Sequence, residues 1–156
     1  MSLVIAHSHY NAGNQDDRKS VTGYLFIVAG GAVYWNSRKQ PTVALSTTEA
    51  EYMAAGAAGR QAAHLMAILK QLGHEIGNVA IMCDSQSAIA VTKNPVQHGR
   101  TKHIDVIHHW VKYKVAAGEL TFEYIDTEQQ PADVLIKALA FVKHQQHAKA
   151  MGLQLN

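Results

Sequence analysis

The stretch VAIMCDSQS, residues 79–87, changes character at its midpoint. Its first five residues are apolar and have the length of a strand, whereas the next four suit the start of a helix, because Asp and Ser side chains accept hydrogen bonds from free N–H groups. A strand that runs directly into a helix is typical of α/β proteins. Asp84 therefore stands at the carboxyl end of a buried strand, where open α/β sheets collect their ligands.

The sequence before this stretch predicts a long helix. Apolar residues recur at alternating steps of four and three between residues 51 and 72, and Gly73 follows as a stop. Glu51 lies on the apolar stripe, so we expect its carboxylate to face the sheet. Glu49 lies about 200° away around the helix and is expected to face water.

Shorter apolar runs predict the other elements. Residues 24–28 and 32–35 flank Gly30-Gly31, which predicts a hairpin closed by a two-residue glycine turn. Further strands are expected at residues 3–6, 42–45 and 120–124, and further helices at residues 104–116 and from Pro131 onward. Strands come first and α/β crossovers follow, so the chain is expected to form a mixed sheet with helices packed on it.

Length and composition bound the class of protein. The chain has 156 residues, 47% of them hydrophobic, and we expect a single domain over residues 1–156. Its only cysteine, Cys83, excludes an intramolecular disulfide and is expected to be a small core residue. No apolar run approaches the length of a membrane span and no secretory signal is evident, so we expect no membrane partner and an intracellular location, in cytoplasm or nucleus. A net charge of +2 permits an anionic partner but falls well short of a dedicated nucleic-acid binder.

Three acids stand at positions suited to chemistry. Glu51 lies on the inner helix face, Asp84 follows a strand, and Asp133 lies in the first turn of the helix that Pro131 opens. Together they are expected to converge on a hard cation such as Mg²⁺. Taken singly, Asp84 and Asp133 are better explained as acids at helix N-termini, and Glu51 can also be a partly buried side chain with its head in water.

The run SRKQPTVALSTTEAEY, residues 37–52, closely resembles the ribonuclease H domain of copia-type LTR retrotransposon polyproteins. Other blocks similar to that family follow in its order over nearly the whole chain, at residues 16–24, 83–89, 100–105, 130–133 and 151–153. Several collinear motifs are far more specific than any one of them.

The resemblance implies a ribonuclease H-like fold, with a five-stranded mixed sheet made of a three-strand antiparallel meander and parallel strands, flanked by helices. It also implies metal-dependent, endonucleolytic hydrolysis of the RNA strand of RNA–DNA hybrids by four acids and two Mg²⁺ ions, with Mn²⁺ as a substitute. Glu51, Asp84 and Asp133 match the family's second, third and fourth acids.

The first acid of the family is missing, because Ser8 occupies its position. A serine supplies no negative charge to hold a cation, so binding of the metal pair should weaken. A loss of about 3 kcal/mol of stabilisation lowers the rate roughly a hundredfold. His7 and His9 alternate with Ser8 and are expected on the opposite side of the sheet. Asp16 and Asp17 are expected to cap a turn rather than to replace the acid.

Other polar residues are expected to contact the nucleic-acid backbone, with ordinary solvation as the alternative for each. These are Arg38, Lys39, Ser85, Gln86, Lys93, Arg100, Lys102 and His103. His144 and His147 stand three apart and favour a solvated helix face over a metal site. Trp110 favours a core position over base stacking.

Two functions from different classes follow. One is a weakened RNase H-type hydrolase; the other is a catalytically silent module that binds nucleic acid or a protein partner through the same fold.

Overall fold

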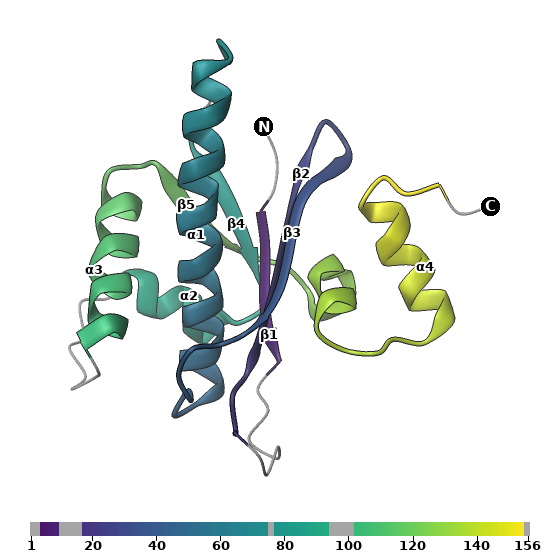
Figure 1. Ribbon diagram of the computed structural model, residues 1–156, viewed down its shortest axis with the longest axis horizontal. Coiled ribbons are helices and arrows are strands. Elements are labelled where there is room, and N and C mark those ends of the chain that lie inside the picture. The colour runs from purple at the N-terminus through teal and green to yellow at the C-terminus, as the bar shows by residue number, and fades with distance from the viewer. Residues whose placement is uncertain (1–3, 10–16, 75–76, 94–101, 155–156) are drawn as a thin grey trace.

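The computed structural model describes residues 4–9, 17–74, 77–93 and 102–154, shown as ribbons in Figure 1. For residues 4–9, 102–105 and 107–108 it describes the backbone alone. No helix among the described residues combines the length and apolarity needed to cross a membrane.

A central sheet organises the molecule. Its strands lie in the order β3-β2-β1-β4-β5, where β1 pairs with β2 and β2 with β3 in antiparallel fashion, while β1–β4 and β4–β5 are parallel. The strands are β1 (Val4–His9), β2 (Val21–Val28), β3 (Gly31–Lys39), β4 (Val79–Cys83) and β5 (Leu120–Tyr124). The expected combination of an antiparallel meander with parallel strands is therefore present.

Helices cover both faces of the sheet (Figure 1). One face carries α1, α2 and α3, and the other carries the 3₁₀ helix η2 and α4. The helices are α1 (Thr47–Gln71), α2 (Gln86–Lys93), α3 (Lys102–Ala116), α4 (Phe141–Ala150) and the 3₁₀ helices η1 (Thr127–Gln129) and η2 (Pro131–Leu135).

Alternation along β2 builds a core on each face. Tyr24 and Phe26 pack with alanines of α1, whose small side chains let the helix approach the sheet closely. Leu25 and Ile27 pack on the other face with Ala132 and Met151, which fastens η2 and the C-terminal region to the sheet.

The start of α1 corrects two expectations. Residues 42–45 form no strand, because the chain leaves β3 at Lys39 and turns directly into the helix. Ser46 caps α1 by accepting a hydrogen bond from the Glu49 N–H at 3.1 Å, and the Glu49 carboxylate accepts one from the Leu45 N–H at 2.7 Å. Glu49 is thereby held in a buried position, 4% exposed, instead of facing water.

Two turns also differ from expectation. The hairpin turn consists of Ala29 and Gly30, both with positive φ, and Gly31 already belongs to β3. A two-residue turn of this kind needs positive φ at both central positions, so the strand register selects residues 29–30. Pro131 opens a short 3₁₀ helix, and α4 begins separately at Phe141.

Candidate metal centre

The end of β4 and the first turns of α1 bring two carboxylates together. One donor atom each from Glu51, Cys83 and Asp84 lies within 4.8 Å of the others. Glu51 is 3% exposed and faces the sheet, as its place on the apolar stripe predicts, while Asp84 is half-buried directly after β4. Two of the three acids singled out in the sequence therefore meet at one sheet edge.

Ser85 caps α2, since its Oγ accepts a hydrogen bond from the Ala88 N–H at 3.2 Å. The Oδ2 atom of Asp84 accepts a hydrogen bond from Thr127 Oγ1 at 3.0 Å. This hydrogen bond ties the carboxylate of Asp84 to the start of η1, close to the end of β4.

Cys83 adds sulfur to the group but no negative charge. Burial raises the pKa of its thiol to about 12, and the charges of Glu51 and Asp84 act in the same direction. A neutral thiol is a poor ligand for a hard cation. The sequence reading of Cys83 as a core residue holds, because the side chain is 1% exposed within the main core, but that reading missed its closeness to the two acids.

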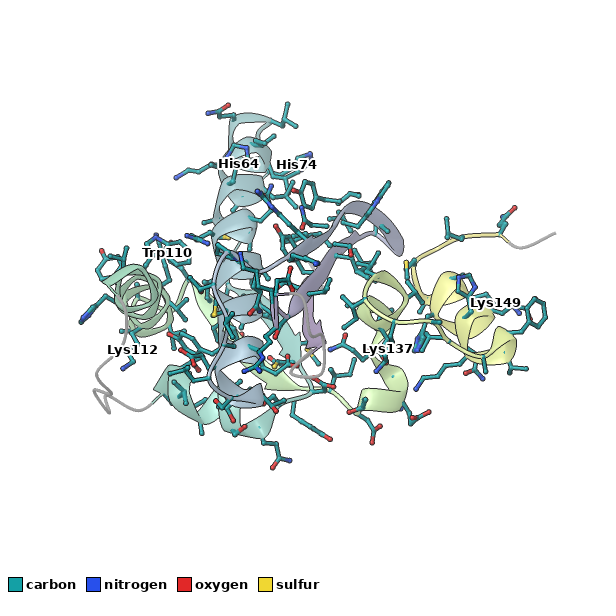
Figure 2. All side chains as sticks on the ribbon, turned by 60° about the horizontal axis from the view of Figure 1, so that its bottom comes forward. His64, His74, Trp110, Lys112, Lys137 and Lys149 are labelled. Carbon is teal, nitrogen blue, oxygen red and sulfur yellow. The ribbon has the colours of Figure 1, made fainter. Side chains whose placement is uncertain are left out.

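Asp133 lies outside this group. It is fully buried in η2, which packs against β1 and β2, and its Oδ2 lies 2.8 Å from Lys137 Nζ, one helical turn further on. Lys137 lies between η2 and α4 (Figure 2). This ion pair was not predicted, although the spacing of four residues between Asp133 and Lys137 was a usable signal.

The backbone of β1 places Ser8 near Asp84, at the carboxyl-terminal end of the parallel strands β1 and β4. Ile5 pairs with Met82 in the parallel β1–β4 ladder, so two further residues along both strands bring residue 7 level with Asp84, and Ser8 follows. Ser8 itself pairs with Thr22 of β2. The side chains of Ser8, His7 and His9 lie outside the described part of the structure.

The residues expected to contact nucleic acid are spread around this edge. Arg38 and Lys39 are exposed at the end of β3, and Lys39 Nζ lies 2.7 Å from Asp17 Oδ2. That contact lowers the pKa of Asp17, which also accepts the Lys19 N–H at 3.1 Å in the turn-capping role expected of it. Asp16 lies outside the described residues.

The other expected contacts lie on α2, α3 and the segment between them. Ser85 is half-buried, Gln86 is exposed, and Lys93 is exposed at the end of α2. Arg100 lies outside the described residues, and for Lys102 and His103 on α3 the structure describes the backbone alone.

Trp110 and the two C-terminal histidines have structural surroundings. Trp110 projects from α3 toward α1 (Figure 2), where its ring packs beside Gly59 and the main core. His144 is exposed and His147 is buried, so the pair does not share a solvated face, and neither belongs to a metal-ligand group among the described residues.

The donor set fits one hard divalent cation. Mg²⁺ is commonly held by one or two protein carboxylates, with water and substrate phosphate completing its shell. Glu51 and Asp84 supply two such carboxylates within 4.8 Å.

No protein-family model matches the chain. A relative in Nicotiana tabacum, the retrovirus-related Pol polyprotein from transposon TNT 1-94, is 45% identical over 145 residues, covering 93% of this chain and 11% of the relative. The chain thus spans about a tenth of the length of the curated relatives it matches.

Solved structures share the fold. RNase H1 from the archaeon Halobacterium salinarum superposes with a TM-score of 0.61 at 13% identity, covering 86% of this chain and 92% of that one. LC11-RNase H1, solved in complex with an RNA/DNA hybrid, gives a TM-score of 0.59 at 16% identity, with 86% and 92% covered. The resemblance to copia-type elements agrees with these matches. The chain is therefore homologous to a segment of the retrovirus-related Pol polyproteins of transposons, and it has the ribonuclease H-like fold.

Proposed function

We propose that the chain binds RNA–DNA hybrids and hydrolyses their RNA strand in a metal-dependent reaction that the loss of the first acid has strongly impaired. The observation that supports this most directly is that the Glu51 and Asp84 carboxylates lie within 4.8 Å of each other, near the end of β1, where Ser8 is the second-last residue. The hybrid in the LC11-RNase H1 structure supports the choice of ligand.

In this proposal Glu51 and Asp84 hold a divalent cation, Mg²⁺ or Mn²⁺. Such a cation, when bound, neutralises phosphate charge and activates water for attack on a phosphodiester. The chain's own contribution is to fix the two carboxylates. Burial in α1 restricts Glu51, and the hydrogen bond from Thr127 orients Asp84.

The proposed weakness lies in the remaining ligands. Ser8 offers a hydroxyl where the family carries an acid, and Asp133 is paired with the Lys137 ammonium. We propose that Asp133 contributes as a ligand only when this ion pair opens. The second metal of the family mechanism is therefore held least well, and a single weakly bound cation leaves turnover slow.

Cation binding and cleavage test the proposal separately. We expect titration with Mn²⁺, followed by electron paramagnetic resonance, to show weak binding that Asp84→Asn abolishes. A labelled RNA–DNA hybrid incubated in Mg²⁺ or Mn²⁺ should be cleaved slowly or not at all. Cleavage at ordinary enzyme rates that Asp84→Asn abolishes would refute the impairment, and equal Mn²⁺ binding by both proteins would refute the site.

The second candidate is a catalytically silent module that binds nucleic acid. The Asp133–Lys137 ion pair favours it, because it supplies a positive charge to an acid that the family uses for metal. This candidate predicts hybrid binding that needs no Mg²⁺ and weakens steeply with salt. Loss of all binding at low salt would exclude it and leave a protein partner as the remaining alternative.

A further inference from the structure

A groove separate from the acids runs between β3 and α1. It has a volume of about 440 Å³, and its walls come from the inner face of β2 and β3 on one side and from α1 on the other. The lining residues that matter here are Thr22, Tyr24, Arg38, Gln40 and Arg60. We call this cavity the arginine groove.

Two guanidinium groups dominate its charge. Arg38 comes from β3 and Arg60 from α1, and both are exposed. Within the described part of the chain neither has a carboxylate at ion-pair distance, whereas neighbouring Lys39 is paired with Asp17. The groove therefore holds two arginine charges that no described acid offsets.

The charges of both arginines affect the pKa of the same side chain, Tyr24, which also lines the groove. Burial raises the pKa of Tyr24 to about 12, and the positive charges of Arg60 and Arg38 oppose that rise. The floor beneath them is ordered, because Gln40 Nε2 donates to Thr22 Oγ1 and to the Ala50 carbonyl, each at 2.9 Å. An anion entering the groove would meet the two guanidinium groups above a floor that is fixed by these hydrogen bonds.

The strand register gives the distance between Arg38 in the arginine groove and Ser8, which lies near the acids. Ser8 pairs with Thr22, and Thr22 pairs with Arg38, so these three residues lie side by side on β1, β2 and β3. Neighbouring strands lie about 4.8 Å apart, which puts the Arg38 backbone about 10 Å from that of Ser8. A nucleic-acid strand covers this distance in roughly three steps of about 3.4 Å rise.

We propose that the arginine groove is a phosphate-binding subsite for a nucleic-acid backbone. Other phosphates of the same strand would lie at the Glu51 and Asp84 carboxylates. Guanidinium groups match phosphate oxygens through paired hydrogen bonds, and two of them on opposite walls can grip one phosphodiester. This inference rests on the proposed function, since it needs nucleic acid at the acids. It assigns Arg60, which the sequence analysis did not single out, to the binding surface.

Binding of a fluorescein-labelled RNA–DNA hybrid, measured by anisotropy over a series of salt concentrations in EDTA, tests the subsite. Each phosphate contact contributes about 0.9 to the slope of log K against log salt. We expect Arg38→Gln and Arg60→Gln each to lower the slope by part of that amount, and the double variant by about 0.9, because the two groups share one phosphodiester. Arg60→Lys should retain the slope because it keeps the charge.

Lys149→Gln is the matched control, because it removes one exposed charge from α4 on the other face of the sheet (Figure 2). It should leave the slope unchanged. Thermal unfolding verifies that all variants fold. If Arg38→Gln and Arg60→Gln bind like Lys149→Gln, the subsite is refuted.

Repeating the series in an Asp84→Asn background separates this inference from the proposed function. The arginine effects should persist there, because the groove needs neither metal nor cleavage. If cleavage and cation binding fail while the arginine effects remain, only the hydrolase proposal falls. If the slopes are insensitive to both arginines while Asp84-dependent cation binding is present, only the subsite falls.

Discussion

At the scale of single residues, the acids at the sheet edge differ in their surroundings. Glu51 and Asp84 share one group of donor atoms, whereas Asp133 is fully buried in η2 and paired with Lys137. A lone buried carboxylate is costly, and a nearby ammonium offsets much of that cost. The ion pair with Lys137 therefore explains how Asp133 can be fully buried outside the group that Glu51 and Asp84 form.

Cys83 should react slowly with alkylating reagents in the folded protein. Only the thiolate reacts, and with a pKa of about 12 its fraction at about pH 8 is on the order of 10⁻⁴. We expect iodoacetamide labelling, followed by mass spectrometry, to be at least a hundredfold slower in the native protein than in urea. Comparable native and denatured rates would show that the thiol is neither buried nor neutral.

His147 should make stability depend on pH. Burial lowers its pKa below the usual 6.5, and of the charged groups around it Asp133 and Glu128 oppose this shift while Lys143 and Lys137 add to it. The neutral form is favoured in the folded state, so its stabilising contribution is complete above about pH 6.5 and is lost as the pH falls through the lowered folded value.

Thermal unfolding from about pH 7.5 down to about pH 5 measures this effect. We expect the wild type to lose more stability over this window than His147→Gln, whose side chain does not titrate. The comparison isolates His147 from the other histidines, which both proteins retain. Parallel pH profiles for the two proteins would contradict the assignment.

Some residue positions were predictable from the sequence and others were not. The placement of Glu51 followed from helical periodicity and that of Asp84 from the end of an apolar strand, which are both local patterns. The burial of Glu49 was not predicted, because helical phase puts it outside and its hydrogen bond to the Leu45 N–H overrides that phase. Arg60 lacked any local signal, since it joins Arg38 only through packing of α1 beside β3.

At the scale of elements, the end of α4 is fastened to the β2–β3 hairpin. The Ala32 N–H donates to the Met151 carbonyl at 2.8 Å, and Gly152 follows with a φ of 81°. A Cβ at Gly152 would lie 2.5 Å from the Gly30 carbonyl oxygen, so the backbone would have to shift.

Gly152→Ala should therefore destabilise the protein through strain and overlap together. Left-handed φ costs a non-glycine residue roughly 1–2 kcal/mol, and overpacking adds about 1–3 kcal/mol. Gly118→Ala is the matched control, because its φ is 70° and nothing lies within 4 Å of the added Cβ. Urea unfolding should show the larger loss for Gly152→Ala. Equal losses would mean that the C-terminal segment does not press on the hairpin.

Elements with a clear hydrophobic period or a continuous apolar run were predicted correctly. These are the hairpin strands, α1, β4, α3 and β5. The failures fall where competing local interactions decide. Residues 42–45 have the composition of a strand, but the Leu45 N–H donates to the Glu49 carboxylate and Ser46 caps α1, so this segment leads into the helix instead. Pro131 does begin a helical turn, but that turn stays 3₁₀ and ends at Leu135.

At the scale of the whole molecule, sheet order assembles the site. Because β1 lies between β2 and β4, the end of β1 adjoins both Asp84 after β4 and, across β2, Arg38 of β3. The acids and the arginine groove thus flank the same strand end, where Ser8 lies. Long-range pairing of this kind has no local sequence signal, and the family resemblance was what made the arrangement foreseeable.

Cleavage of a labelled RNA–DNA hybrid by Ser8→Asp, compared with the wild type in Mg²⁺, measures whether the missing carboxylate at position 8 limits catalysis. If Glu51 and Asp84 form a cation site that lacks one carboxylate, the added acid should raise the rate roughly a hundredfold, equivalent to about 3 kcal/mol, and Asp84→Asn should remove the gain. A folded Ser8→Asp protein that cleaves no faster than the wild type would contradict the account.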